Sequence, residues 1–363
     1  MNDEKQKTEP KFSRREVIGK GTSVLAVGAV GAALAIAPSA KACSSCQEGL
    51  KKNPPPAGSV VIGSKLHETV TVNQNTQSAP EPTFAEPPNA TEFLHRFDYG
   101  KVSKLANGQI CRDYVLVGTD VEIEVADGVM FPAWTINDSV PGPTLRATEG
   151  DLLRIHFFNH TVRDHTLHFH GIHASNMDGT FEIVPPGGYY VYEFVAEPFG
   201  LFVYHCHMTP LRKHISRGMY GTFIVDPKEG RTPANEMVMV MNGFDTEVSN
   251  DSNSFYAVNG KAFAYRDEPI VLNHGEPVRI YLTNMTEFDL INSFHLHGDM
   301  FKLFRTGTRL DNYEITDTVM LCQGERCILE FNFKFSGRFL FHAHQGEFTE
   351  RGWLGIFDVR KAI

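Results

Sequence analysis

Four histidine pairs, each with one residue between its two histidines, constrain the fold of this chain more than any other feature. The pairs are His168-Phe169-His170, His205-Cys206-His207, His295-Leu296-His297 and His342-Ala343-His344. In a β-strand, residues i and i+2 project to one face while residue i+1 projects to the other. Each pair therefore predicts a strand with two imidazoles on one side, and Cys206 should point away from its two flanking histidines.

Cys206 is the centre of a candidate thiolate metal site. His214 and Met219 follow it in the chain. His165 lies three residues before His168, an odd offset that places it on the Cys206 face of its strand. Two imidazoles, a thiolate and a weak thioether form a blue-copper electron-transfer centre. A lone Met or His usually has a structural role, but these residues occur together beside a His-x-His strand, so we expect a copper site.

The eight paired histidines predict a second, larger metal site. Imidazoles without a carboxylate among them suit copper, with zinc as the alternative. A structural zinc site closes with four ligands, so eight histidines are too many for one ion and are enough for a small cluster. The other histidines are expected to be structural, although His173 is close enough in sequence to support the site; they are His67, His95, His156, His160, His173 and His274.

The rest of the chain predicts an all-β fold. Hydrophobic and polar residues alternate at 121–125 and 278–282, and turn signals such as Asp127-Gly128 and Asn259-Gly260 separate such segments. Many short strands with Gly and Pro turns indicate Greek-key sandwiches or barrels. The alternating methionines at 237–241 are interpreted as a strand rather than as a copper-handling stripe.

On these motifs the chain resembles multicopper oxidases of the small two-domain type, which are laccase-like in chemistry and related in architecture to copper nitrite reductases. The resemblance covers about residues 91–360, and further matching motifs are Pro141-Gly142-Pro143-Thr144-Leu145, Met177-Asp178-Gly179 and Asn259-Gly260-Lys261. It implies two cupredoxin-like Greek-key β-barrel or sandwich domains, at residues 91–228 and 229–363.

The resemblance also implies copper as the cofactor, with four ions per chain. The type 1 copper would bind His165, Cys206, His214 and Met219. The type 2 copper would bind His168 and His295. The two type 3 coppers would bind His170, His205, His207, His297, His342 and His344. The division of the eight histidines between type 2 and type 3 stays open.

Domain 2 departs from the family pattern at the positions of a second type 1 site. Those positions hold Asn292, Ala343, Phe348 and Trp353, so we expect no blue copper in domain 2. In copper nitrite reductases the residue that matches His168 is Asp, and the residue that matches His207 is apolar. Both are histidine here, which favours a full cluster over a single copper between domains.

The expected function is one-electron oxidation of a phenolic donor, an aromatic amine or a metal ion, coupled to four-electron reduction of dioxygen to water. Oxygen reduction consumes protons, so a carboxylate near the cluster is expected, with Asp178 first and Glu347 second. The alternatives are a nitrite reductase-like enzyme and a non-catalytic copper electron-transfer protein. The resemblance further implies a cyclic homotrimer, with each cluster between domain 1 of one subunit and domain 2 of the next.

The N-terminus resembles a twin-arginine export signal. Ser13-Arg14-Arg15 precedes an apolar run at 21–37, and Ala40-Lys41-Ala42 fits a cleavage site, so residues 1–42 are expected to be a signal peptide. An uncleaved membrane anchor is the alternative. The mature protein would then be periplasmic or secreted, with no membrane span. Residues 43–90 are rich in Pro, Ser and Thr and are interpreted as an extended arm or linker.

Cysteine content and charge complete the sequence-based picture. Of six cysteines, Cys43 with Cys46 and Cys322 with Cys327 are close enough in sequence for local disulfides, which would leave Cys111 free. Lipidation of Cys43 is the alternative. The formal net charge is −9, which does not favour nucleic acid as a partner and attracts cations at long range.

Overall fold

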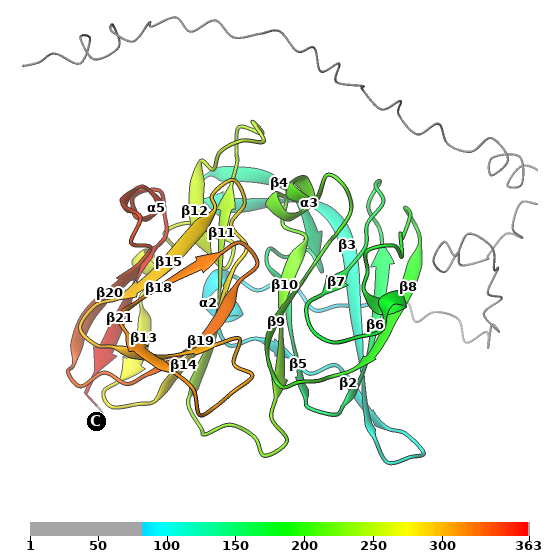
Figure 1. Ribbon diagram of the computed structural model, residues 1–363. Coiled ribbons are helices and arrows are strands. Elements are labelled where there is room, and N and C mark those ends of the chain that lie inside the picture. Colours follow the sequence, from blue (N-terminus) through cyan, green and yellow to red (C-terminus); the bar gives the residue numbers. More distant parts are fainter. Residues whose placement is uncertain (1–81, 362–363) are drawn as a thin grey trace, which may run out of the picture. The chain divides into compact units, whose positions relative to one another are not determined.

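The computed structural model describes residues 82–361, all of which belong to one compact unit. The predicted signal peptide, most of the predicted arm, Cys43, Cys46 and His67 lie outside these residues. The described chain consists mainly of β-strands with short helices between them (Figure 1). Among these residues, none of the helices combines the length and the apolar character that a membrane span requires.

Two sheets form domain 1. One has the strand order β1-β5-β10-β9-β7, and the other has the order β2-β3-β6-β8 with β4 paired to β3. The strands are β1 (Phe97–Asp98), β2 (Lys101–Lys104), β3 (Ile110–Ala126), β4 (Val129–Ile136), β5 (Gly142–Thr148), β6 (Leu152–Asn159), β7 (His168–Phe169), β8 (Tyr189–Val195), β9 (Gly200–His205) and β10 (Tyr220–Asp226). Strand β10 is parallel to β5 and antiparallel to β9, so the sheet is mixed.

Domain 2 repeats this arrangement. Its sheets have the orders β12-β11-β14-β19-β16-β17 and β13-β21-β20-β15-β18. The strands are β11 (Asn235–Phe244), β12 (Phe255–Val258), β13 (Ile270–Asn273), β14 (Val278–Asn284), β15 (Ile291–Leu296), β16 (Phe301–Arg305), β17 (Glu314–Thr316), β18 (Thr318–Cys322), β19 (Arg326–Phe331), β20 (Gly337–His342) and β21 (Leu354–Arg360). The prediction of an all-β fold with two cupredoxin domains is confirmed.

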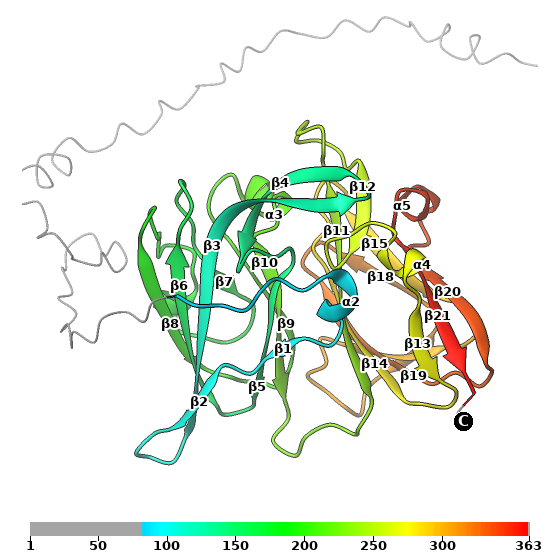
Figure 2. The same ribbon diagram turned by 180° about the vertical axis from the view of Figure 1, so that it is seen from behind.

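One short helix, α2 (Ala90–Phe93), precedes β1, and the others lie between strands. These others are the 3-10 helix η1 (Ser175–Met177), α3 (Leu211–Ser216), α4 (Ala264–Asp267) and α5 (Gly346–Glu350). Helix α3 follows β9 and precedes β10, and α5 occupies the corresponding place between β20 and β21 (Figures 1 and 2). The second and fourth histidine pairs begin at the last residues of β9 and β20, His205 and His342, and end in the loops that follow, so each domain presents its histidines at the end of one sheet.

The alternating segments are strands, as the sequence predicts. Residues 121–125 lie in β3, 237–241 in β11 and 278–282 in β14. The methionines of β11 belong to the hydrophobic core of domain 2, whereas Val238 and Val240 on the other face belong to a separate cluster. That cluster also contains Leu201 and Val203 of β9, so it joins the two domains. The methionine stripe is therefore part of a packed strand.

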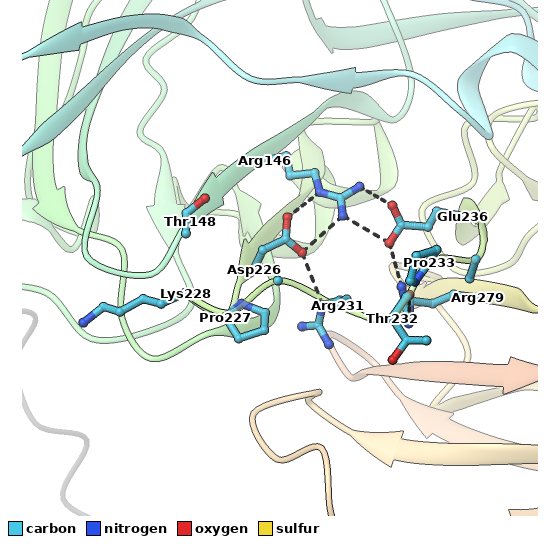
Figure 3. Close-up of a pocket in the computed structure, with 12 residues that line it drawn as sticks. Arg146, Thr148, Asp226, Pro227, Lys228, Arg231, Thr232, Pro233, Glu236 and Arg279 are labelled. Atoms are coloured by element: carbon cyan, nitrogen blue, oxygen red, sulfur yellow. Dashed lines mark hydrogen bonds and ion pairs between the residues drawn. The ribbon is translucent and has the colours of Figure 1, made fainter.

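An ionic network crosses the domain junction (Figure 3). The guanidinium of Arg146 on β5 binds Asp226 and Glu236, each at 2.7 Å. Glu236 on β11 also binds Arg279 at 3.0 Å and accepts a 2.6 Å hydrogen bond from the Tyr281 hydroxyl. Both arginine side chains are buried. The network links the end of domain 1 to the first strand of domain 2 around the connecting segment.

The predicted disulfide between Cys322 and Cys327 is wrong, because both cysteines are free. Cys322 ends β18 and is exposed, whereas Cys327 lies on β19 and is buried in the domain 2 core. These strands belong to different sheets, so the two side chains lie in different environments although they are only five positions apart in the sequence. Cys111 is free and buried.

Candidate metal centre

The Cys206 sulfur and two imidazole nitrogens converge into a triangle. Cys206 Sγ lies 3.4 Å from His165 Nδ1 and 3.2 Å from His214 Nδ1, and the two nitrogens are 3.2 Å apart. A metal ion at the centre of this triangle would lie about 2 Å from each atom, an ordinary metal–nitrogen distance. All three residues are buried. The donors and their spacing fit a copper ion held by a thiolate and two imidazoles.

Separate elements bring these ligands together. Cys206 follows β9 directly, and His214 lies on α3. His165 is fixed by two backbone hydrogen bonds with Val184, of 3.1 and 2.8 Å. Met219, the fourth predicted ligand, is fully buried in the same hydrophobic cluster as Cys206, and its backbone oxygen accepts a 2.9 Å hydrogen bond from the Cys206 N–H.

Burial keeps the two imidazoles of this triangle neutral. Burial, together with the charges of His214 and Arg163, lowers the pKa of His165 to about 3. Burial and the charges of Lys213 and Arg163 lower the pKa of His214 to about 4. Burial raises the pKa of the Cys206 thiol to about 11. Neutral imidazoles offer their lone pairs at ordinary pH, while metal binding must displace the thiol proton.

Domain 1 contains a second set of ligands, called here the domain 1 histidine group: His168, His170, His205 and His207. His168 pairs with His205 across β7 and β9, and their ring centres are 5.3 Å apart. His170 Nε2 lies 3.2 Å from His205 Nε2, which is the separation of two nitrogens on one ion with bonds of about 2 Å. The His207 ring lies 5.5 Å from that of His168.

Domain 2 repeats the geometry in the domain 2 histidine group: His295, His297, His342 and His344. His295 pairs with His342 across β15 and β20, with ring centres 5.4 Å apart. His297 Nε2 lies 3.0 Å from His342 Nε2. The His344 ring lies 5.3 Å from that of His295. The chain therefore carries two half-sites of the same design.

Backbone carbonyls orient one histidine on each strand of these half-sites. A carbonyl oxygen can only accept, so the contacting Nδ1 carries the proton and Nε2 keeps a lone pair for a metal ion. The Nδ1–carbonyl distances are 2.8 Å for His168 with Asp178, 3.0 Å for His205 with Cys206, 3.0 Å for His295 with Asp317 and 2.6 Å for His342 with Ala343.

Sequence reasoning missed two hydroxyl groups that support the histidine groups. Thr166 Oγ1 accepts a 3.0 Å hydrogen bond from the His207 N–H, and Ser293 Oγ accepts a 2.8 Å bond from the His344 N–H. Each hydroxyl residue lies two positions before the first His-x-His pair of its domain, Thr166 before His168 and Ser293 before His295. The repeated pattern of a hydroxyl residue before His-x-His was the available signal.

The thiolate site and the domain 1 histidine group share three consecutive residues. The side chain of Cys206 lies with His165 and His214, while its neighbours His205 and His207 belong to the histidine group. The opposite directions expected for alternate residues at the end of a strand account for this division. An electron at the thiolate would therefore be only a few covalent bonds from the histidine group.

Domain 2 has no such thiolate site in its described residues. Ala343 stands where domain 1 has Cys206, and the fully buried indole of Trp353 donates a 3.0 Å hydrogen bond to Asn292 Oδ1. Phe348 stacks on Tyr256 with ring centres 3.8 Å apart. Large side chains and a satisfied polar pair thus replace the ligands of a type 1 site.

The two predicted acids differ in their surroundings. Asp178 Oδ1 lies 3.4 Å from His168 Nδ1 and 3.9 Å from His173 Nε2, so it borders the domain 1 histidine group. His173, which the sequence places close enough to support the site, also contacts the Phe169 carbonyl at 2.7 Å. Glu347 on α5 is exposed and pairs with Arg351 at 3.0 Å. Its role as a proton donor stays a prediction.

The structure does not bring the two histidine groups together within the described chain. Each cluster of potential metal ligands draws on one domain alone. Exposed apolar side chains lie near the first histidine pair of each domain in sequence: Ile172, Phe181 and Ile183 in domain 1, and Leu290 and Met300 in domain 2. Apolar residues around a polar site are typical of a surface that another protein covers.

Comparisons with known proteins agree with this fold and site. Models of the multicopper oxidase family match residues 119–230 and 232–362. A solved structure described as a multicopper oxidase is 50% identical, with a TM-score of 0.74, over 75% of this chain and 97% of that chain. A copper nitrite reductase from Nitrosomonas europaea is 25% identical, with a TM-score of 0.64, over 69% of this chain and 94% of the other.

Among curated proteins, the copper-containing nitrite reductase of Neisseria meningitidis serogroup A is 29% identical over 66% of this chain and 67% of that protein. Fold, ligands and comparisons together define a copper protein built of two cupredoxin domains. The chain belongs to the multicopper oxidase family and is related to the copper nitrite reductases.

Proposed function

We propose that this protein oxidises a small donor by single electrons at the Cys206 site and reduces dioxygen to water at a cluster of three copper ions. The observation that carries the proposal is the presence of two matching half-sites of four imidazoles each, one of them adjoining the thiolate through His205 and His207. Copper, when bound, would supply the one-electron redox chemistry. Four copper ions per chain can store the four electrons that dioxygen requires.

The residues of the chain have separate tasks in this scheme. Cys206 and its imidazole partners would receive the electron, and the backbone from Cys206 to His205 and His207 would conduct it. The eight histidines would hold the dioxygen-reducing cluster, with type 2 ligation by His168 and His295. Asp178, which borders His168 and His173, would hold and release protons for oxygen reduction.

Nitrite reduction is the second candidate, because nitrite reductases are among the similar proteins. Two residues favour dioxygen. His168 and His207 both lie in the domain 1 histidine group, with rings 5.5 Å apart. A site for a single copper between domains would not need either imidazole, and in the nitrite reductase pattern an acid and an apolar residue take their places.

A cluster of three ions needs both half-sites, so the half-sites must meet between subunits. We propose a cyclic homotrimer in which domain 1 of each subunit faces domain 2 of the next, because head-to-tail contacts of this kind close into a ring. The exposed apolar residues near each half-site, such as Phe181 and Leu290, would be buried in these contacts. Each trimer would then contain three clusters.

The donor class and the location are also proposed. Phenols, aromatic amines and metal ions are the proposed donors, since the Cys206 site lies just beneath the surface at α3. Export by the twin-arginine route to the periplasm or the exterior is proposed from the sequence at Ser13-Arg14-Arg15.

The test is oxygen uptake by the copper-loaded protein with a phenolic donor, set against nitrite turnover with the same donor. We expect oxygen to be consumed at four donor electrons per molecule, without peroxide, and nitrite to be left unchanged. In His207→Ala, oxygen uptake should fall to background while the visible absorption of thiolate-bound copper remains. Nitrite turnover without oxygen uptake, or normal turnover by His207→Ala, would contradict the proposal.

A further inference from the structure

A group of positive charges lies over the Cys206 site, although the protein as a whole is acidic. The group is called here the cationic rim and consists of Arg163, Arg212, Lys213 and Arg217. Each of these side chains rests on an aromatic ring. We propose that the cationic rim binds small anionic electron donors, an inference that rests on the proposed role of the Cys206 site as the electron acceptor.

Trp134 connects the cationic rim to the buried ligands. Its ring meets the imidazole of His214 nearly edge-on, with centres 4.9 Å apart, and that of His165 with centres 6.0 Å apart. On the indole, the Arg163 guanidinium lies 4.5 Å from the ring centre and Lys213 Nζ lies 5.6 Å from it. Trp134 is only 7% exposed. A molecule held by these two cations would therefore be separated from the imidazoles by little more than one indole.

The other two cations extend the rim on either side. The guanidinium of Arg217, just after α3, lies 5.3 Å from the Phe131 ring centre. The backbone oxygen of Arg217 accepts a 2.9 Å hydrogen bond from the backbone N–H of Trp134. Arg212, on α3, lies 4.8 Å from the ring centre of Phe288 in domain 2. The rim thus follows α3 from the Trp134 side to the domain junction.

Most of this positive charge is not neutralised. Arg163 forms an ion pair with Asp120 at 2.9 Å. Across residues 82–361, no carboxylate lies within ion-pairing distance of the other three cations. Two further acids act on the rim from inside the protein: Asp245, whose charge acts on Arg217, is buried. Burial raises the pKa of Glu287, on which the charge of Arg212 acts, to about 7, so this acid is only partly charged at neutral pH.

These features favour an anion at the site. Stacking on aromatic rings restrains the cations. One guanidinium nitrogen of Arg212 donates to the Asn250 carbonyl and one of Arg217 donates to the Pro132 carbonyl, so their remaining N–H groups and the Lys213 ammonium are the donors for carboxylates or sulfonates. The net charge of −9 repels anions from most of the surface, so a local positive potential is needed to attract them. In the reaction, the anion would lose one electron to a copper(II) ion held by Cys206, His165 and His214. Dioxygen remains the final acceptor.

The first test measures reduction of the thiolate-bound copper by rapid mixing, under anaerobic conditions, as bleaching of its visible absorption. The donors are ferrocyanide, neutral hydroquinone and the cation hexaammineruthenium(II). In the double variant Arg212→Gln/Lys213→Gln, we expect the rate constant with ferrocyanide to fall about tenfold, as for lost electrostatic steering. The rate should change little with hydroquinone and rise with the ruthenium complex.

The control is Lys302→Gln. Lys302 also rests on a ring, 4.8 Å from the centre of Tyr313, but it lies on β16 in domain 2. Its ferrocyanide rate should equal that of the wild type. Equal rates for the double variant and the wild type with all three donors would overturn the inference.

The second test needs neither electron transfer nor copper. Hexacyanocobaltate(III) has the shape of ferrocyanide but is not readily reduced, and its binding can be measured by calorimetry on copper-free and copper-loaded trimer. We expect wild type and Lys302→Gln to bind it and the double variant to bind it about tenfold more weakly at low salt. Binding that the double variant does not weaken would overturn the inference and leave the proposed function standing. Absence of the thiolate absorption in the wild type would instead remove the proposed function.

Discussion

Cys206 connects two sets of potential metal ligands, because its side chain points to one set and the side chains of its neighbours belong to the other. The sulfur completes a triangle with His165 and His214, while His205 and His207 turn to the other metal site. Nothing else in the described chain offers a second thiolate at a comparable position, since Ala343 occupies the equivalent place in domain 2. One side chain therefore decides whether a thiolate copper site can form.

Replacement of this one atom should separate the two metal sites. In Cys206→Ser we expect the intense visible absorption of thiolate-bound copper to vanish and donor oxidation to fall at least 100-fold, while roughly three copper ions per chain remain on the histidines. Cys111→Ser removes a buried thiol that is far along the chain from these ligands, and this variant should keep the visible absorption and the donor oxidation. The checks are absorption spectroscopy and copper analysis. A Cys206→Ser protein that stayed blue would contradict the assignment.

At the scale of strands, the sequence predicts those features that depend on the spacing of residues within one segment. Each His-x-His pair involves a strand, as expected, although it lies at the strand's end, and the core methionines of β11 follow from alternation. Contacts between distant segments are different. Trp134 reaches the copper ligands from β4, about thirty residues before His165, and no local pattern marks it. Cys322 and Cys327 show the reverse case, since they are close in sequence but belong to different sheets.

The ionic network between β5 and β11 should contribute strongly to stability. Arg146→Met would leave Asp226 and Glu236 partly buried without their main partner, which costs about 3 kcal/mol in comparable buried pairs. We expect the free energy of unfolding, measured by denaturant titration, to fall by about this amount. The matched control Arg309→Met breaks an exposed pair with Asp311 and should cause no measurable change. An equal effect of both variants would contradict this role.

The same network predicts how stability depends on pH. Burial alone would raise the pKa of Glu236, but hydrogen bonds from Arg146, Tyr281 and Arg279 outweigh it and lower the pKa to about 2. A carboxylate whose pKa is lower in the folded state stabilises the fold above its unfolded pKa of about 4.5, and this stability is lost as the pH falls toward 2. Unfolding experiments from pH 6 to pH 2 should therefore show a steeper loss of stability in the wild type than in Glu236→Gln. Parallel curves would contradict the prediction.

At the scale of the whole molecule, the central feature is that the two histidine groups lie in different domains and form separate ligand clusters. Each group has four imidazoles and an apolar surround that includes strongly exposed side chains, such as Leu290 at 83% exposure. In the proposed assembly, another surface would complete each half-site. The chain carries both surfaces, so a ring of identical subunits would satisfy every half-site.

Subunit mixing tests this arrangement. His170→Ala disables the domain 1 histidine group and His297→Ala disables the domain 2 group, so each variant alone should lack oxygen uptake. In mixed rings made by co-expression, a subunit with an intact domain 1 can face one with an intact domain 2, which restores about a quarter of the clusters. We expect oxygen uptake near a quarter of the wild-type value. Each variant should keep its visible absorption, which shows that domain 1 is folded. No recovery on mixing would mean that the cluster does not join two chains.

The most direct measurement is an anomalous difference map, recorded at the copper absorption edge, from crystals of the copper-loaded protein. The account predicts one isolated peak between Cys206, His165 and His214. It also predicts three peaks close together, enclosed by the domain 1 histidine group of one subunit and the domain 2 histidine group of its neighbour. Single, separate peaks at the two histidine groups, with no shared cluster between subunits, would contradict it.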